Sequence, residues 1–318
     1  MEIIGKNQIE TILEKADLFP AIKDAFINFS LGNVTTPPVG YLPFPEVNGD
    51  LHIKYGHIKG DDTFVIKISS GFYDNPKLGL PSSNGLMMVL SAKTGEPIAL
   101  LLDEGMLTDT RTAIAGAIAS YTLKPAASSV IGIIGTGIQA RLQLFYLSKL
   151  IPNAKIYVWG RNTENTQKYL NDIAHMGLAA TACSSLETLC NKANIIITTT
   201  PSTEAIVLDN WVQPGTHITA VGADAPGKQE LDAAIFKRAA FTVFDSKEQC
   251  IHHGEASHSE IEFHDRNSAE LGAILNDPKL YRRQERDISV ADLTGIAAQD
   301  IAIAKAVWQQ ASTNNRST

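Results

Sequence analysis

The chain has 318 residues, 44% of them hydrophobic, and its 27 lysine and arginine residues against 34 aspartate and glutamate residues give a formal charge of −7 at pH 7. A chain of this length and composition can bury a large core and is expected to form two domains. The net negative charge argues against nucleic acid or an anionic membrane as the main partner.

The sequence carries neither an export signal nor a metal-binding pattern. No apolar run approaches the ~20 residues that cross a bilayer, and residues 1–6 lack a secretory pattern. The three cysteines, Cys183, Cys190 and Cys250, have no metal-ligand spacing, and the histidines at 252–253 lack a supporting cluster. We therefore expect a cytoplasmic protein with reduced thiols and no metal site.

The N-terminal third predicts a helix followed by a sheet. Apolar residues spaced by three and four predict one helix over residues 9–29, and a segment broken by two prolines follows it. Strand-like segments separated by short turns rich in glycine, asparagine and aspartate come next, at residues 50–55, 63–68, 85–90 and 97–102. Short turns favour a largely antiparallel sheet. A helix is expected over residues 108–123.

Beyond residue 123, short apolar strands alternate with helical segments. The expected strands are residues 130–134, 156–159, 195–198, 217–221, 241–244 and 288–290. This alternation predicts an α/β fold with a Rossmann-type, doubly wound parallel sheet, next to a second domain with a mixed, largely antiparallel sheet. A helix over residues 292–308 is expected to return to that second domain. We place the dinucleotide-binding domain at 118–299, and the other domain at 1–117 with 300–318.

The most informative motif joins the first of these strands to a helix. The apolar segment 130–134 runs directly into Gly135-Thr136-Gly137-Ile138-Gln139-Ala140, and an amphipathic segment follows. The first glycine permits a tight turn, the second lets the backbone approach a pyrophosphate, and the small alanine lets the helix pack close to the strand. The phosphates would face free N–H groups at the positive end of the helix. The motif predicts a dinucleotide site; the alternative is a purely structural turn.

The end of the next strand indicates which dinucleotide is bound. Arg161, followed by Asn162, lies about 20 residues beyond the glycine turn, where an NAD-binding enzyme usually has an acidic residue for the ribose 2′-hydroxyl. A guanidinium instead pairs with a 2′-phosphate, which a carboxylate would repel. We therefore expect NADPH, with NADH as the alternative cofactor. The competing interpretation of Arg161 is an arginine that caps a surface turn.

Further segments place reactive groups beside turns. Lys67 lies in a strand-like apolar run, where a cation is costly to bury unless it meets an anion. Arg111 opens a helix and can hold a carboxylate through two parallel hydrogen bonds. Asp224 follows a strand of the nucleotide domain, where ligands of open α/β sheets bind, and Thr200 with Pro201 follows another. The alternatives are an edge-strand lysine, a surface arginine and a helix-capping aspartate.

Six motifs occur in order along nearly the whole chain, at residues 67–76, 101–113, 135–140, 222–227, 243–246 and 292–295. Together they resemble the ornithine cyclodeaminase/mu-crystallin family. The resemblance implies a Rossmann domain, a sheet domain that dimerises, and hydride transfer between a nicotinamide and the α-carbon of an amino or imino acid.

The resemblance also implies roles for individual residues. Lys67 and Arg111 would hold the substrate carboxylate, Lys67 would assist proton transfer, and Asp224 would be the acid/base at the substrate nitrogen. Family members often carry an arginine after Pro37-Pro38; Val39 stands there instead, and His57 is a candidate to fill part of the pocket. The implied cofactor contacts are Gly135, Thr136, Gly137, Ile138, Gln139, Ala140, Arg161, Asn162, Thr200, Pro201, Val221, Gly222 and Gly295.

The expected activity is NAD(P)H-dependent reduction of a small cyclic imino acid, such as Δ1-pyrroline-2-carboxylate, to the L-amino acid, here L-proline. Three alternatives stay open. They are ornithine cyclodeamination, which gives L-proline and ammonia, an alanine dehydrogenase-like reaction, and a non-catalytic nicotinamide-binding protein. The expected partners are the small-molecule substrate and a second copy of the chain, with no nucleic acid and no membrane.

Overall fold

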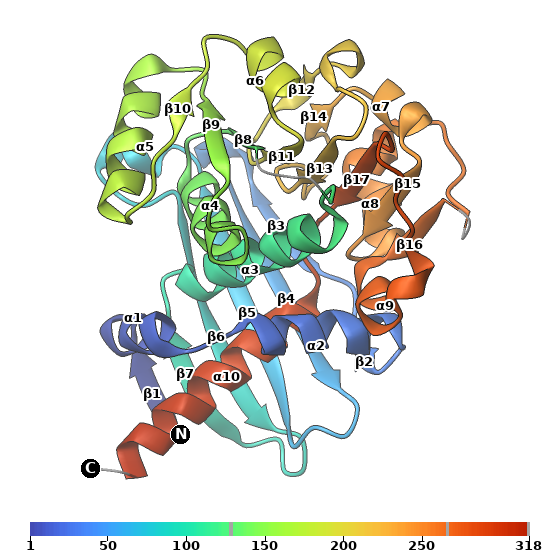
Figure 1. Cartoon of the computed structure of the whole chain (residues 1–318). Coiled ribbons are helices and arrows are strands. Elements are labelled where there is room, and N and C mark those ends of the chain that lie inside the picture. The colour runs from blue at the N-terminus through green and yellow to red at the C-terminus, as the bar shows by residue number, and fades with distance from the viewer. Residues whose placement is uncertain (127–129, 265–266, 317–318) are drawn as a thin grey trace. The chain divides into compact units, whose positions relative to one another are not determined.

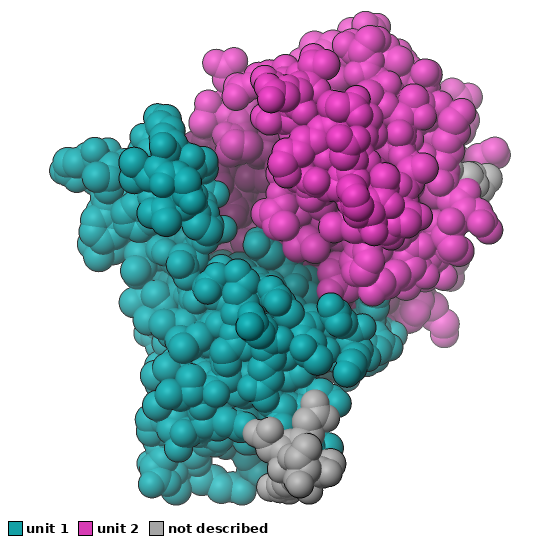
Figure 2. Space-filling model, turned by 90° about the vertical axis from the view of Figure 1, so that its left-hand side faces the viewer, with its two compact units in different colours: residues 1–111, 296–318 teal, residues 112–295 magenta. Residues whose placement is uncertain are grey.

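The computed structural model describes residues 1–126, 130–264 and 267–316, and the chain divides into two compact units (Figure 2). Unit 1 comprises residues 1–111 and 296–318, and unit 2 comprises residues 112–295. Within the described residues, no helix is both long and apolar enough to span a lipid bilayer.

Unit 1 is built on a seven-stranded sheet in the order β1-β7-β6-β5-β4-β2, with β3 also paired to β4. The strands are β1 (Glu2–Gly5), β2 (Val34–Thr35), β3 (Gly40–Phe44), β4 (Gly49–Ile58), β5 (Thr63–Phe72), β6 (Ser83–Ser91) and β7 (Pro97–Leu102). Every pair is antiparallel except β1 with β7. The largely antiparallel sheet is confirmed, and β1 was missed because so short a strand shows no clear alternation.

Helices cover one face of this sheet. α2 (Phe19–Ser30) packs against α10 (Ala297–Arg316), which crosses β4, β5, β6 and β7, while α1 (Lys6–Lys15) lies against β1 and β7 (Figure 1). The single helix expected over residues 9–29 is wrong. The chain leaves α1 at Ala16, which is extended with ψ 133°, and α2 restarts with Pro20 in its first turn, where proline is tolerated.

The C-terminal helix begins later than the sequence pattern predicted. Residues 289–292 form strand β17 (Ser289–Asp292), and α10 begins at Ala297. Gly295, with φ +81°, turns the chain between the two elements. The small residues around this turn suit a helix as well as a strand end, so the pattern alone placed the helix start at residue 292. The turn leaves Gln299 and Asp300 in the first turn of α10.

Unit 2 contains an eight-stranded sheet in the order β10-β9-β8-β11-β13-β17-β15-β16, and all its pairs are parallel. Its other strands are β8 (Val130–Ile134), β9 (Lys155–Trp159), β10 (Thr181–Ala182), β11 (Ile195–Thr198), β13 (His217–Ala220), β15 (Phe241–Phe244) and β16 (Ser268–Glu270). The chain order reverses on either side of β8. This is the doubly wound, Rossmann-type sheet that the sequence predicted.

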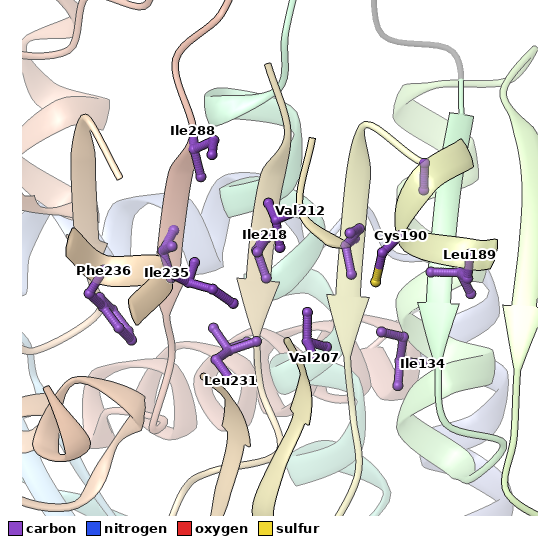
Figure 3. Close-up of a cluster of buried hydrophobic side chains, with 14 of the residues drawn as sticks. Ile134, Leu189, Cys190, Val207, Val212, Ile218, Leu231, Ile235, Phe236 and Ile288 are labelled. Atoms are coloured by element: carbon purple, nitrogen blue, oxygen red, sulfur yellow. The ribbon is translucent and has the colours of Figure 1, made fainter. Parts of the chain in front are cut away.

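Both faces of the parallel sheet are covered. On one face, α3 (Met106–Leu123) meets β13 through the hydroxyls of Ser120 and Thr219, 2.7 Å apart, and α4 (Ile138–Leu150) packs beside α3. On the other face lie α6 (Leu186–Lys192), α7 (Ala234–Arg238) and the small sheet of β12 (Thr203–Val207) and β14 (Gln229–Leu231). Figure 3 shows apolar side chains that pack between the sheet and these elements, among them Ile218 of β13, Leu189 of α6 and Phe236 of α7. The remaining helices are α5 (Thr163–His175), α8 (Lys247–His253) and α9 (Leu271–Asn276).

Candidate active site

Lys67 and Arg111 meet at one carboxylate in unit 1. Lys67 Nζ lies 3.0 Å from Oδ2 of Asp300, and Arg111 Nε donates to Oδ1 of the same residue at 2.9 Å. Arg111 Nη1 donates at 2.9 Å to Oε1 of Gln299. All four side chains are buried. We call Lys67, Arg111, Gln299 and Asp300 the cation cluster.

Three elements supply the cation cluster. β5 alternates buried and half-buried residues, so Val65 and Lys67 point to the face that α10 covers, while Ile66 points to the other. Arg111 comes from α3. Gln299 and Asp300 are consecutive residues of α10 that bind the same guanidinium. The structure therefore brings together Lys67 and Arg111, the two cations that the sequence analysis proposed as site residues.

Positive charge outweighs negative charge in the cation cluster. Burial lowers the pKa of Lys67 to about 7; Asp300 opposes this shift, while Arg111 and Lys54 reinforce it. Burial alone would raise the pKa of Asp300, yet Lys67 and Arg111 hold it below its usual value. Lys54 stands directly opposite Lys67 on β4 and on the same face of the sheet. One carboxylate thus faces three basic side chains, and this arrangement suits binding of an additional anion.

Sequence reasoning missed Gln299 and Asp300. They sit in a helical segment rich in alanine and isoleucine, which was interpreted only as a packing surface. The sequence did contain a signal for them, namely two adjacent polar residues within an apolar helix. An amide and a carboxylate on a buried helix face need hydrogen-bonding or charged partners, so such a pair indicates a buried polar site.

His57 is not part of the cation cluster. In the register of β4 with β5, Lys54 pairs with Lys67 whereas His57 pairs with Phe64, which places His57 on the opposite face of the sheet from Lys67. Its Nε2 lies 3.0 Å from the carbonyl oxygen of Asp61. The structure therefore gives His57 a local partner in unit 1 and does not bring it to the nominated cations.

The glycine turn of unit 2 has the geometry of a dinucleotide site. Gly135 has φ +118°, and a Cβ there would lie 2.5 Å from Oγ1 of Thr199. Gly137 is the N-cap of α4, and a Cβ there would meet nothing within 4 Å. Ala140 is buried, and Tyr169 donates to its carbonyl at 3.1 Å. Open space thus adjoins the N-terminus of α4, as phosphate binding requires.

The residues after β9 differ in their environments. β9 is the parallel neighbour of β8, so Arg161 and Asn162 lie at the same edge of the sheet as the glycine turn. Arg161 is exposed. Asn162 caps α5, because its side-chain oxygen accepts from the backbone N–H of Asn165 at 2.8 Å. Both residues are exposed, but the side chain of Asn162 is engaged as a helix cap, which leaves Arg161 as the candidate for a cofactor contact.

A buried carboxylate that sequence reasoning missed, Glu230, holds the ends of β11 and β13. It accepts hydrogen bonds from the hydroxyl of Thr198 at 2.6 Å, the hydroxyl and N–H of Thr200, and the N–H of Gly222 at 2.8 Å. Burial raises the pKa of Glu230 to about 6, against the effect of these donors. The Thr200 hydroxyl therefore donates to the protein itself, and Glu230 fixes the loops that follow two neighbouring strands.

The remaining nominated residues also follow strands of unit 2. Asp224 comes after β13; its side chain is 52% exposed and lies 2.6 Å from Lys228 Nζ. Val221 is buried and Pro201 is exposed. The N–H of Gly295 donates to Asp245 at 2.5 Å. Over the ranges that the structure describes, no group of three or more His, Cys, Asp or Glu residues is arranged to hold a metal ion.

Comparison with known proteins identifies relatives over the full length of the chain. Residues 2–315 match the ornithine cyclodeaminase/mu-crystallin family. An uncharacterised cyclodeaminase of Sinorhizobium fredii is 39% identical over 317 residues, which cover 98% of this chain and 96% of the relative.

Two solved structures are similar over both units. The archaeal alanine dehydrogenase dimer with bound NAD has a TM-score of 0.89 and 32% identity, covering 99% of this chain and 97% of that chain. The Δ1-pyrroline-2-carboxylate reductase of Thermococcus litoralis, in complex with NADH and L-proline, has a TM-score of 0.91 and 26% identity, covering 99% and 98%. With its Rossmann-type sheet and its glycine turn, the chain belongs to the ornithine cyclodeaminase/mu-crystallin family and is a nicotinamide-dependent oxidoreductase.

Proposed function

We propose that this protein uses NADPH to reduce a small cyclic imino acid to the L-amino acid, with Δ1-pyrroline-2-carboxylate and L-proline as the expected pair. The cation cluster is the observation that carries the proposal. Two buried cations held at one carboxylate, with a third basic side chain opposite, form a binding place for a carboxylate. The reductase from Thermococcus litoralis, which was solved with L-proline, supports this choice of substrate.

The cation cluster would orient the substrate. Nε and Nη1 of Arg111 are used within the cluster, and Nη2 has no hydrogen bond in the described part of the chain. Nη2 and the Lys67 ammonium would therefore hold the substrate carboxylate, and holding a substrate in one orientation accelerates its reaction. When bound, the reduced nicotinamide supplies a hydride to the imine carbon.

The imine nitrogen must gain a proton. Protonation of the nitrogen makes the imine carbon a better hydride acceptor, and a group whose pKa lies near neutrality is suited to the proton transfer. Lys67, with its pKa lowered to about 7 by burial, is one proposed donor. Asp224 is the proposed acid/base at the substrate nitrogen, and its side chain is half exposed where the chain leaves a strand of unit 2.

NADPH is the proposed cofactor because of Arg161. Its exposed guanidinium lies at the edge of the sheet that carries the glycine turn. It stands where an acidic residue would select NADH, and it can pair with a 2′-phosphate. The glycine turn at 135–140 would hold the pyrophosphate, and Thr200, Pro201, Val221, Gly222 and Gly295 would line the remainder of the cofactor.

A homodimer is proposed from the second face of the unit 1 sheet. Five apolar residues stand opposite one another across five strands on this face: Ile3, Leu100, Met88, Ile66 and Tyr55. Ile3 is 60% exposed and Tyr55 40% exposed, and the other three are half-buried. An apolar face of this kind marks an interface, and the archaeal alanine dehydrogenase is a dimer.

The mass of the protein in solution tests this homodimer. We expect a mass of about 69 kDa by light scattering, twice the 34.4 kDa chain. The Ile66→Asp, Met88→Asp double variant should give the mass of one chain.

Ornithine cyclodeamination is the second candidate, because the Sinorhizobium fredii relative is called a cyclodeaminase. Such a substrate brings an additional ammonium group. The excess of basic over acidic side chains in and opposite the cation cluster disfavours a second positive charge near the bound carboxylate, so the reductase is preferred.

Absorbance of the reduced cofactor tests the proposal directly. Purified protein is mixed with Δ1-pyrroline-2-carboxylate and either NADPH or NADH, and the product is identified by chromatography. We expect oxidation of NADPH with formation of L-proline, and loss of this activity in Arg111→Ala. No oxidation of either cofactor would refute the proposal, and L-ornithine with NAD would then be tested for ammonia release.

A further inference from the structure

Only the oxygen of the Gln299 carboxamide makes a hydrogen bond among the described residues, whereas its nitrogen makes none. Its Oε1 accepts from Arg111 Nη1 at 2.9 Å. A guanidinium can only donate, so the oxygen must face Arg111 and the orientation of the carboxamide is fixed. Nε2 then faces away from that contact, and it is buried without a hydrogen-bond partner among the described residues. Since Gln299 is only 1% exposed, bulk water does not compensate this donor.

Asp300 determines how the two cations of the cluster are held. Oδ1 accepts from Nε of Arg111, and Oδ2 lies 3.0 Å from Nζ of Lys67. One carboxylate therefore fixes both cations and leaves donors unused on each, namely Nη2 of Arg111 and the other ammonium hydrogens. Together with Nε2 of Gln299, the free groups on Lys67, Arg111 and Gln299 are all donors, and the remaining acceptor, Oδ2 of Asp300, is occupied by its ion pair with Lys67. Such a set recognises an anion and rejects a cation.

We propose that Gln299 and Asp300 complete an anion-binding site with Lys67 and Arg111. Asp300 is a positioning residue that holds both cations, and Gln299 Nε2 donates a hydrogen bond to the bound carboxylate. The identity of the ligand as an imino acid rests on the proposed function. Recognition of a carboxylate rests on the donor set alone.

The decisive variant is Gln299→Glu. Glutamate keeps an oxygen that can accept from Arg111, so a residue whose only task is to hold that guanidinium would tolerate the change. It replaces the Nε2 donor by a second carboxylate oxygen, which would repel a bound carboxylate. We expect the KM for the imino acid and the Kd of L-proline to rise by about tenfold or more, since hydrogen bonds to charged groups are strong. The kcat should change less than the KM.

The control is Gln309→Glu, which makes the same change at an exposed position of the same helix. It should leave KM, kcat and L-proline binding as in the unchanged protein. NADPH affinity, measured by fluorescence titration, should be the same in both variants. If Gln299→Glu does not fold, Gln299→Leu keeps the buried volume, and it should also weaken L-proline binding by about tenfold.

The outcomes separate this inference from the proposed function. Turnover of the imino acid by Gln299→Glu with an unchanged KM would show that Gln299 does not bind the carboxylate. The proposed reductase activity would remain supported. Absence of turnover, with L-proline binding that Gln299→Glu abolishes, would refute the reductase and uphold the anion site. A protein that binds no carboxylate at all would overturn both.

Discussion

Arg111 and Asp300 are 189 positions apart in the sequence, yet Nε of one donates to Oδ1 of the other at 2.9 Å. This contact joins the start of α3 to the start of α10 within unit 1. It would also couple binding to stability, because the carboxylate that holds the two proposed substrate-binding cations is itself buried with them.

Replacing the shared carboxylate should destabilise the protein strongly. In Asp300→Asn, Lys67 and Arg111 remain buried without their anion, and breaking a buried ion pair from one side costs about 3–5 kcal/mol. Denaturation by urea measures the free energy of unfolding. Asp61→Asn breaks the partly exposed pair with Lys305 and should cost less than about 1 kcal/mol. Equal losses in the two variants would contradict the special role of Asp300.

Carboxylate binding should weaken as pH rises above 7. Burial lowers the pKa of Lys67 to about 7, so the free protein carries a charged Lys67 mainly below that pH and a neutral one above it. A bound carboxylate favours the charged form, so binding above pH 7 takes up a proton. Calorimetric titration with L-proline between pH 6 and 8.5 should show Kd rising by up to about tenfold per pH unit above 7. In Lys67→Arg the pH dependence should disappear; a Kd that does not change with pH in the unchanged protein would contradict this assignment.

His217 should make the protein less stable in acid. Burial, aided by the charge of Arg283, lowers the pKa of His217 to about 3. The unfolded chain binds a proton at this histidine near pH 6.5 and the folded chain does not, so this contribution to stability falls as pH drops from 6.5 towards 3. Between pH 7 and 5 the loss is about 2 kcal/mol.

Comparison with His217→Asn isolates this effect. The buried acids Glu230, Asp292 and Glu255 have raised pKa values of about 6, 7 and 9, so they act in the opposite direction and favour stability at low pH. They are common to both proteins and largely cancel in the difference. The stability advantage of the unchanged protein over the variant should therefore shrink on acidification, and a constant difference would refute the prediction.

The two glycines of the dinucleotide turn should respond differently to alanine. Gly135→Ala meets both a positive φ and a contact of 2.5 Å with Thr199, so it should cost about 1–3 kcal/mol of stability and also weaken NADPH binding. At Gly137 a Cβ has no protein atom within 4 Å, and it would project into the space where a phosphate approaches. Gly137→Ala should therefore keep the melting temperature and lose NADPH affinity. Full affinity in Gly137→Ala would argue against this phosphate site.

Cofactor preference should depend on Arg161. Removing its exposed guanidinium in Arg161→Ala should lower kcat/KM for NADPH by about tenfold while changing the value for NADH little, since only NADPH carries the 2′-phosphate. The neighbouring Asn162 is occupied as a helix cap, so Asn162→Ala is expected to reduce stability without changing the ratio. An unchanged ratio in Arg161→Ala would favour NADH as the cofactor.

Local patterns predicted the parts of this fold that depend on neighbouring residues. Most β-strands of the two sheets and the glycine turn follow from alternation, apolar runs and small residues within a few positions, whereas β1, β2, β3, β10 and β16 were not predicted. The start of α10 was misplaced, because Gly295 ends the preceding segment through a backbone conformation that composition does not reveal. The gap between α1 and α2 was missed for a similar reason.

Side-chain pairing over long distances was beyond the sequence. Lys67 and Arg111 were nominated one by one, whereas their common partner Asp300 is in the last helix of the chain. The assignment of His57 to the pocket ignored strand register, which puts it on the opposite face from Lys67. The anchoring role of Glu230 likewise depends on two loops that meet only after the parallel sheet has formed.

Unit 1 is interrupted in the chain, and α10 comes from residues beyond the whole of unit 2. During synthesis, β5 emerges from the ribosome long before Asp300 exists, so Lys67 has no carboxylate to receive it at that stage. Unit 2, by contrast, is continuous and can be completed as soon as residue 295 has emerged. The proposed anion site therefore cannot form until α10 has been made, and a nascent chain can gain the Rossmann-type fold of unit 2 before its cation cluster is complete.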